Sequence, residues 1–163
     1  MISFTKLRWN FLNEVFVDSS VIVAHCMVGN KSFERLLELY KICTSPNVIE
    51  EAFYKCLYLK TESIEGKGGK YLLRDDYIRK KEYYEEIVDY FNVLIRELVE
   101  AESLKVLPIT DEIVLHSIEV SWKYSLLPND ALIAATCKHY GIRKIATFDE
   151  DFKRVDFLEV LEL

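Results

Sequence analysis

Short apolar runs alternate along the chain with longer segments in which apolar residues recur every three or four positions. The short runs predict buried strands, and the longer spacing predicts amphipathic helices. The strands are expected at 14–18, 41–44, 104–107, 145–148 and 157–161. The helices are expected at 21–28, 32–40, from about 47 onward, 75–100, 111–123, and from about 130 to a cap at Gly141. This alternation predicts an α/β fold in which helices cover both faces of a central parallel sheet.

The whole chain, 1–163, is interpreted as one domain, because 163 residues, 50% of them hydrophobic, fill one core but not two. Residues 1–13 precede the first strand as an N-terminal extension. A long helical pair is expected at 48–100, and its exposed connection at 61–70 holds three of the five glycines.

Two of the predicted helices carry an apolar stripe at helical spacing. The stripe of the helix at 75–100 comprises Tyr84, Ile87, Val88, Phe91, Ile95 and Leu98. In the helix at 111–123, a spacing of four residues aligns Val114, Ile118 and Trp122.

The net charge of −6 argues against a protein that holds nucleic acid by bulk electrostatics, because such domains are usually basic. That objection weakens where acids are concentrated to bind a divalent cation, so the placement of the acids matters more than their number. No apolar run approaches the roughly 18 residues that suggest a membrane span, and the chain lacks a signal-peptide layout, so a cytoplasmic protein is expected. Free buried thiols are expected at the four cysteines, Cys26, Cys43, Cys56 and Cys137.

Four acids fall at the ends of strands or the starts of helices. Asp18 and Asp149 follow the first and fourth strands, Glu51 lies early in the helix after the second strand, and Asp130 opens a helix. The carboxyl ends of parallel strands share one sheet edge, so these carboxylates are expected to meet there. Like charges held together raise one another's pKa, and a hard cation such as Mg²⁺ removes the conflict. Such a cation also activates water for phosphoester hydrolysis.

The first two acids also have ordinary structural interpretations. Asp18 can cap the following helix, although Ser19 and Ser20 are available for that purpose. Glu51 can be a first-turn acid that answers the helix dipole.

The last two acids have similar alternatives. Asp130 can cap its helix, although Asn129 is an equal candidate one residue earlier. Asp149 can belong to a turn that begins an acidic surface run, and Asp151 is interpreted as a residue that caps or decorates the next turn. Because four acids reach one edge from separate elements, we favour a metal site over four unrelated structural roles.

Four segments in this order resemble the PIN-domain nucleases, which include the toxins of VapBC-type toxin–antitoxin pairs. The segments are Val-Phe-Val-Asp-Ser-Ser (15–20), Ser-Pro-Asn-Val-Ile-Glu-Glu (45–51), Asn-Asp-Ala-Leu-Ile-Ala-Ala (129–135) and Thr-Phe-Asp-Glu-Asp-Phe (147–152). The resemblance covers about 14–161. It implies a three-layer α/β/α fold with strand order 3-2-1-4-5 and an endoribonuclease that requires Mg²⁺ or Mn²⁺. It also implies an RNA substrate, a homodimer and, for a toxin, an antitoxin partner.

The resemblance also assigns site residues. It implies that the catalytic and metal-binding acids are Asp18, Glu51, Asp130 and Asp149, and that Glu51 is preferred to Glu50 because it stands three residues after Val48. The hydroxyls of Ser19 and Thr147 match positions that support a carboxylate or a metal-bound water. Supporting roles are therefore expected for Ser19, Thr147, Asn129 and Asp151.

Two other function classes share some of these features. A non-catalytic PIN-like scaffold or RNA-binding protein can keep the acids as a regulatory cation site. A flavodoxin-like nucleotide or receiver domain has a similar sheet but needs a phosphate loop or a lysine late in a strand, and Lys144 begins its strand instead. The glycines and lysines at 66–70 do not make a phosphate loop, because they follow no strand. The three histidines show no ligand spacing and are interpreted as structural or surface residues.

Overall fold

A computed structural model describes residues 13–163 and contains a five-stranded sheet with the order β3-β2-β1-β4-β5. All neighbouring strands are parallel. The strands are β1 (Glu14–Val17), β2 (Lys41–Thr44), β3 (Leu104–Val106), β4 (Lys144–Ala146) and β5 (Glu159–Val160). This sheet confirms the predicted strand order. Of the predicted extension at 1–13, all but the last residue lies outside the described part of the chain.

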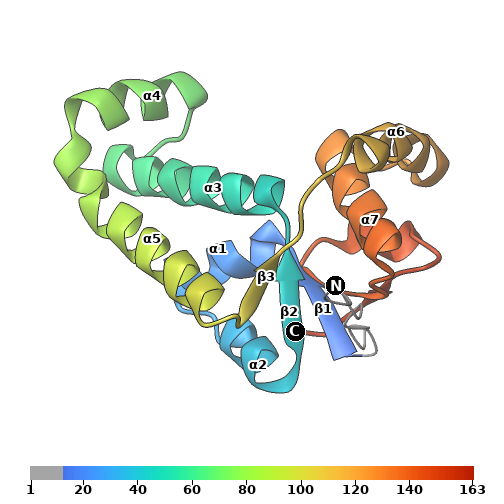
Figure 1. Cartoon of the computed structure of the whole chain (residues 1–163). Helices are drawn as coiled ribbons and strands as arrows, with labels where there is room; N and C mark the ends of the chain where they lie inside the picture. The colour runs from blue at the N-terminus through green and yellow to red at the C-terminus, as the bar shows by residue number, and fades with distance from the viewer. Residues whose placement is uncertain (1–12) are drawn as a thin grey trace, which may run out of the picture.

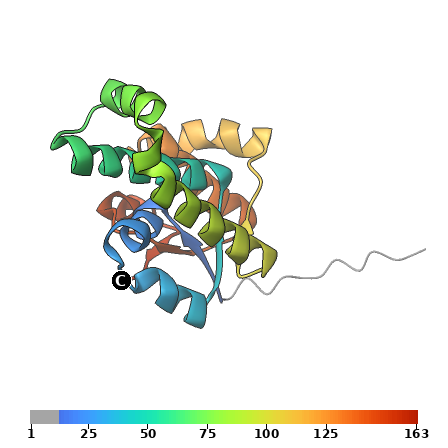
Figure 2. The same cartoon turned by 90° about the vertical axis from the view of Figure 1, so that its left-hand side faces the viewer.

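Helices cover both faces of the sheet in three layers (Figures 1 and 2). One layer contains α1, α2, α3 and α5, which pack on one another, and the opposite layer contains α6 and α7. The helices are α1 (Ser19–Val28), α2 (Ser32–Leu39), α3 (Pro46–Glu65), α4 (Lys70–Arg79), α5 (Glu85–Glu100), α6 (Asp111–Tyr124) and α7 (Pro128–Tyr140), with short 3₁₀ turns η2 (Lys81–Tyr84) and η3 (Glu150–Arg154). Every residue of β1 is buried, as expected of a central strand with helices on both faces.

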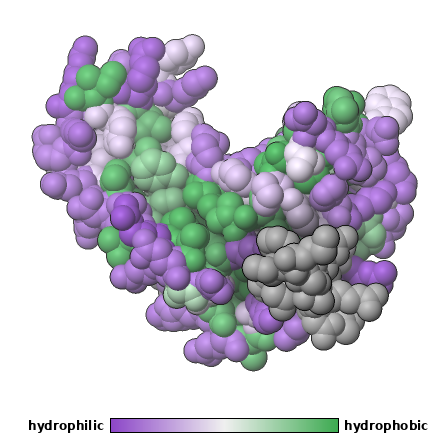
Figure 3. Space-filling view, in the orientation of Figure 1, coloured by the Kyte–Doolittle hydropathy of each residue, from purple (hydrophilic) through white to green (hydrophobic). Residues whose placement is uncertain are grey.

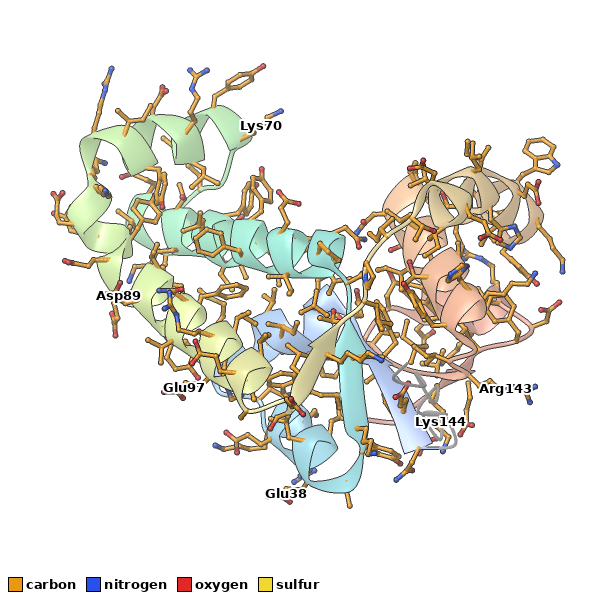
Figure 4. All side chains as sticks on the ribbon, in the orientation of Figure 1. Glu38, Lys70, Asp89, Glu97, Arg143 and Lys144 are labelled. Atoms are coloured by element: carbon orange, nitrogen blue, oxygen red, sulfur yellow. The ribbon has the colours of Figure 1, made fainter. Side chains whose placement is uncertain are left out.

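The strand order reverses beside β1, where sites form at the carboxyl edge of such sheets. From β1 the chain enters α1 on one face, whereas β3 leads to α6 and α7 on the other. The carboxyl ends of β1, β2 and β4 and the N-terminal ends of α3 and α7 therefore meet at one edge. Arg143 and Lys144 lie at the opposite edge and point outward in Figure 4, so Lys144 does begin its strand.

The connection predicted at 61–70 is shorter than expected. Helix α3 continues to Glu65 and α4 begins at Lys70, so only 66–69 connect them. Thr61 is fully buried, and its hydroxyl bonds the Leu57 carbonyl at 3.1 Å and the Tyr84 hydroxyl at 2.8 Å. The contact with Tyr84, which lies outside α3, stabilises helix in a polar segment. Gly66 ends α3 with a φ of +69°, a conformation that favours glycine.

The single helix predicted at 75–100 is divided into the end of α4, η2 and α5. Lys80, between α4 and η2, pairs with Glu65 and lies 3.3 Å from the Asp76 carboxylate, which ties the break to α3. The stripe predicted from the sequence does supply buried residues, namely Tyr84, Ile87 and Phe91.

The stripe predicted in α6 does not face the core. Trp122 is 91% exposed, Ile118 67% and Val114 47%, whereas α6 buries Ile113 and Val120. None of the helices described from residue 13 onward has the length and apolarity needed to cross a membrane.

Candidate active site

Asp18 is held at the carboxyl end of β1 by backbone and side-chain contacts. Its N–H donates to the Ala146 carbonyl at 3.0 Å, which extends the pairing of β1 with β4. Its Oδ2 accepts from the Ser20 hydroxyl and from the Thr147 hydroxyl, both at 2.8 Å, and from the Ser20 N–H at 3.4 Å. Asp18 is therefore the N-cap of α1, as the structural interpretation proposed, and it also reaches β4.

Thr147 connects Asp18 to Asp149. Its hydroxyl donates to Asp18 and accepts from the Asp149 N–H at 2.9 Å. Ser20 makes a parallel connection, because its hydroxyl accepts from the Phe148 N–H at 3.1 Å. The two hydroxyls fix the segment after β4 against the start of α1. This role of Ser20 was not foreseen, although an Asp-x-Ser sequence at a strand end is a recognisable local signal.

Glu51 lies in the second turn of α3, since the helix begins at Pro46, and so it is not a first-turn acid. Its Oε2 accepts from the Asn129 amide at 2.6 Å, and its Oε1 pairs with the Lys55 ammonium at 2.8 Å. Asn129 also accepts from the Asn47 amide at 2.8 Å. The amides of Asn47 and Asn129 thereby join the N-terminal ends of α3 and α7 and orient the Glu51 carboxylate.

Carboxylate oxygens of Asp130, Asp149 and Asp151 lie within 4.8 Å of one another. Asp149 is the N-cap of η3 and accepts from the Asp151 N–H at 2.8 Å. It therefore also has the structural role in a turn that was the alternative to metal binding. Asp151 pairs with the Arg154 guanidinium at 2.7 Å. Asp151 therefore lies in the same cluster of carboxylates as Asp130 and Asp149.

Asp130 is the third residue of α7, whose N-cap is Leu127 without a side-chain hydrogen bond. It does not cap its helix. Burial raises the pKa of the Asp130 carboxyl to about 6, and the charges of Asp149, Asp18, Glu51 and Asp151 add to the shift in that order. All five acids thus face a common region.

The arrangement fits a hard divalent cation. Carboxylate oxygens are its preferred ligands, and its charge would relieve the repulsion that raises the pKa of Asp130. Of the supporting residues expected from the sequence, Thr147 and Asn129 contact site acids directly, whereas the Ser19 hydroxyl accepts from Lys55 at 3.2 Å. Asn47 and Lys55 were not foreseen, although the spacing of Glu51 and Lys55 is that of a helical ion pair.

The other candidate side chains are occupied elsewhere. His25 contacts the Tyr90 hydroxyl at 3.0 Å, and His116 contacts the Glu119 carboxylate at 3.3 Å. The four cysteines are free thiols, as expected. Among the described residues, these groups supply no second cluster of metal ligands.

Comparisons with known proteins agree with this geometry. Residues 15–158 match the family model of the PIN domain. Ribonuclease VapC6 of Methanocaldococcus jannaschii is 36% identical over 155 residues, which cover 92% of this chain and 97% of that protein. The VapC20 toxin of Mycobacterium tuberculosis, described as cleaving the sarcin-ricin loop, superposes with a TM-score of 0.57 at 19% identity and 91% and 99% coverage. A toxin–antitoxin complex from Klebsiella pneumoniae gives a TM-score of 0.56 at 16% identity and 91% and 96% coverage.

Proposed function

Because the chain belongs to the PIN domain family, we propose that it is an endoribonuclease that hydrolyses RNA phosphodiester bonds with Mg²⁺ or Mn²⁺. The observation that carries the proposal is the convergence of four other carboxylates on Asp130, whose pKa is raised by burial and further by their charges. A charged cluster of this kind is costly unless a ligand uses it. The ribonuclease to which the chain is 36% identical supports RNA as the substrate.

The residues that hold the cation in this proposal are Asp18, Glu51, Asp130 and Asp149. When bound, a divalent cation lowers the pKa of a coordinated water and stabilises charge on the phosphate oxygens. Asp151 lies close enough to join them, but its carboxylate is already paired with Arg154. We therefore assign it a supporting role.

Hydrogen bonds keep the site acids in place before substrate arrives. Thr147 and Ser20 fix one oxygen of Asp18, and Asn129 fixes one oxygen of Glu51. Among the described residues, no hydrogen-bond donor contacts the Asp130 carboxylate, so its oxygens remain available for a ligand. Positioned groups of this kind reduce the reorganisation that the reaction requires.

Incubation of the protein with a panel of labelled single-stranded RNAs tests this function. Cleavage is expected with Mg²⁺ or Mn²⁺, and EDTA is expected to stop it. Asp18→Asn is expected to lose cleavage while it keeps its fold, because the amide retains the shape and removes a unit of charge. Wild-type protein that binds the cation but cuts no RNA would instead support a non-catalytic scaffold.

An antitoxin partner is the second part of the proposal, and it is supported by the toxin–antitoxin complex among the similar structures. A groove of about 760 Å³ lies between α3 and α5. Figure 3 shows hydrophobic residues gathered on the inner side of the part of the molecule that contains these two helices. Its apolar lining includes Pro46, Ile49, Phe53, Val88, Phe91 and Ile95. We assign this groove to an apolar segment of an antitoxin. The product of a neighbouring short gene is expected to co-purify with wild type and to be lost from Ile95→Glu.

We also propose a homodimer formed through the exposed stripe of α6. Val114, Ile118 and Trp122 expose their side chains on one face of this helix, and Leu115 on the same face is 67% exposed. A self-complementary stripe suits a twofold interface, in which the same patch is used by both copies.

A further inference from the structure

The five site acids are accompanied by only two basic partners among the described residues, Lys55 and Arg154. Arg154 is anchored by three of its five N–H donors, which contact the Asp151 carboxylate at 2.7 Å and the carbonyls of Tyr124 and Ser125 at 3.1 and 3.0 Å. These contacts hold η3 against the end of α6. Arg154 is therefore a structural cation.

Lys55 is placed differently. Its ammonium lies 2.8 Å from Glu51 Oε1 and donates to the Ser19 hydroxyl at 3.2 Å, so it bridges α3 and the start of α1 beside the acids. Its side chain is 45% exposed. An ammonium carries three N–H donors, and the described residues use two of them. One donor of Lys55 and its positive charge thus remain available at the border of the site.

An RNA phosphate that approaches the site acids meets several carboxylates, and Lys55 is the cation that pairs with Glu51, one of the proposed cation ligands. We propose that Lys55 binds a phosphate of the RNA backbone next to the site acids, an inference that rests on the proposed function. The phosphate takes the third N–H donor of Lys55. If Glu51 held a divalent cation, its carboxylate would pair less strongly with the Lys55 ammonium, which would then be freer to contact the substrate. Lys55 thereby offsets the repulsion between an acidic protein and a polyanion.

Two variants, one without the charge of Lys55 and one that keeps it, separate this role from that of an ordinary helical ion pair. Lys55→Met keeps much of the length of the side chain and removes its charge, whereas Lys55→Arg keeps the charge and the donors. Lys31→Met is the control, because Lys31 forms an exposed pair with Glu34 at 2.9 Å and lies at the opposite end of α1 from the site. Circular dichroism establishes that each variant is folded.

The first measurement is steady-state RNA cleavage at fixed Mg²⁺ over a range of monovalent salt. Lys55→Met is expected to raise KM at least about threefold with kcat little changed, the pattern produced by loss of uniform substrate binding. The slope of log(kcat/KM) against log salt is expected to fall by about 0.7, the value for one phosphate contact on a single strand. Lys55→Arg is expected to restore the wild-type slope, and Lys31→Met is expected to behave as wild type.

The second measurement is Mn²⁺ binding in the absence of RNA, followed by the loss of the free-ion paramagnetic resonance signal. Because Lys55 occupies an oxygen of Glu51, its removal is expected to tighten Mn²⁺ binding about twofold or more. Weaker Mn²⁺ binding together with a lower kcat would show that Lys55 merely positions Glu51, and the inference would fail. An unchanged salt slope in Lys55→Met, with wild type and Lys31→Met active, would overturn the inference alone. Wild type that cleaves no RNA would overturn the proposed function, and this inference with it.

Discussion

Replacement of Asp130 by asparagine separates the charge of the site from its shape. Burial and the surrounding acids raise the pKa of Asp130 from 3.8 to about 6. A shift of about two pKa units corresponds to roughly 3 kcal/mol in the free energy of unfolding at neutral pH. Because the carboxylate is only half-buried, solvent screening reduces this value to about 1–2 kcal/mol. Without a cation, Asp130→Asn is therefore expected to be more stable than wild type by this amount.

The stability difference between Asp130→Asn and wild type depends on pH, because the pKa of Asp130 is raised in the folded state. The folded state binds a proton at Asp130 more tightly than the unfolded state, so the penalty on wild type is fully present above about pH 6 and vanishes below pH 3.8. Thermal melting of both proteins in EDTA measures this stability penalty. The melting temperature of the variant is expected to exceed that of wild type by about 2–8 °C at neutral pH, and the gap is expected to close as the pH falls toward 4.

Addition of Mg²⁺ is expected to make wild type more stable than Asp130→Asn. Wild type gains about 2.7 kcal/mol when the cation is at a hundredfold excess over its Kd, whereas the variant binds more weakly and gains less. A variant that is markedly less stable than wild type in EDTA would identify Asp130 as a structural residue of α7. A variant that keeps its melting temperature but cuts RNA at the wild-type rate would show that the catalytic site lies elsewhere.

Asp149→Asn is expected to abolish metal-dependent RNA cleavage, whereas Asp151→Asn keeps most of it because Arg154 already neutralises that carboxylate; single-turnover cleavage ranks the two variants, and the reverse ranking would exchange their roles. Asn129→Ala is expected to lower kcat about tenfold without a change in fold, because Glu51 loses a hydrogen bond worth about 1.5 kcal/mol; wild-type kinetics would show that this amide is not needed. Trp122→Glu is expected to convert a dimer into a monomer during sedimentation at micromolar concentration, and the dimer proposal fails if wild type already sediments as a monomer.

The sheet was predictable because its strands are short, apolar and bounded by turns or helix starts. Residues 15–17 are completely buried, so their sequence contains no polar alternation that competes with the strand interpretation. The segment 61–65 was harder, because Thr-Glu-Ser-Ile-Glu has no strong apolar period. Its helical state depends on the contact of Thr61 with Tyr84, a residue 23 positions away. Local composition carries no information on that contact.

The placement of the acids followed from the same topology. Asp18 follows β1 directly and Asp149 lies a short distance after β4, so a parallel sheet brings both to one edge whatever the helices do. The residues that orient these acids were harder to predict from the sequence. The Asn47–Asn129 hydrogen bond joins side chains 82 positions apart, and it depends on how closely the ends of α3 and α7 approach. Sequence periodicity fixes the faces of these helices but not that separation.

The exposed stripe of α6 illustrates the limit of apolar periodicity. The spacing of Val114, Ile118 and Trp122 indicates that one face of the helix is apolar, but it does not say which partner covers that face. In the structure, α6 packs on α7 through Ile113 and Val120 instead. Periodicity thus identifies an apolar helix face, but it does not establish that the rest of the chain buries that face.

The charge of the protein and its proposed substrate are reconciled by where the acids lie. Five carboxylates gather in one region, where they would oppose RNA binding unless a divalent cation offset part of their charge. The basic groups Lys55 and Arg154 offset a further part, and of the two Lys55 is the one that pairs with Glu51, a proposed ligand of the cation. In this proposal the local potential at the site acids, not the net charge of −6, governs access of the phosphate backbone. It follows that monovalent salt weakens RNA binding only modestly, since one lysine contact contributes a salt slope of about 0.7.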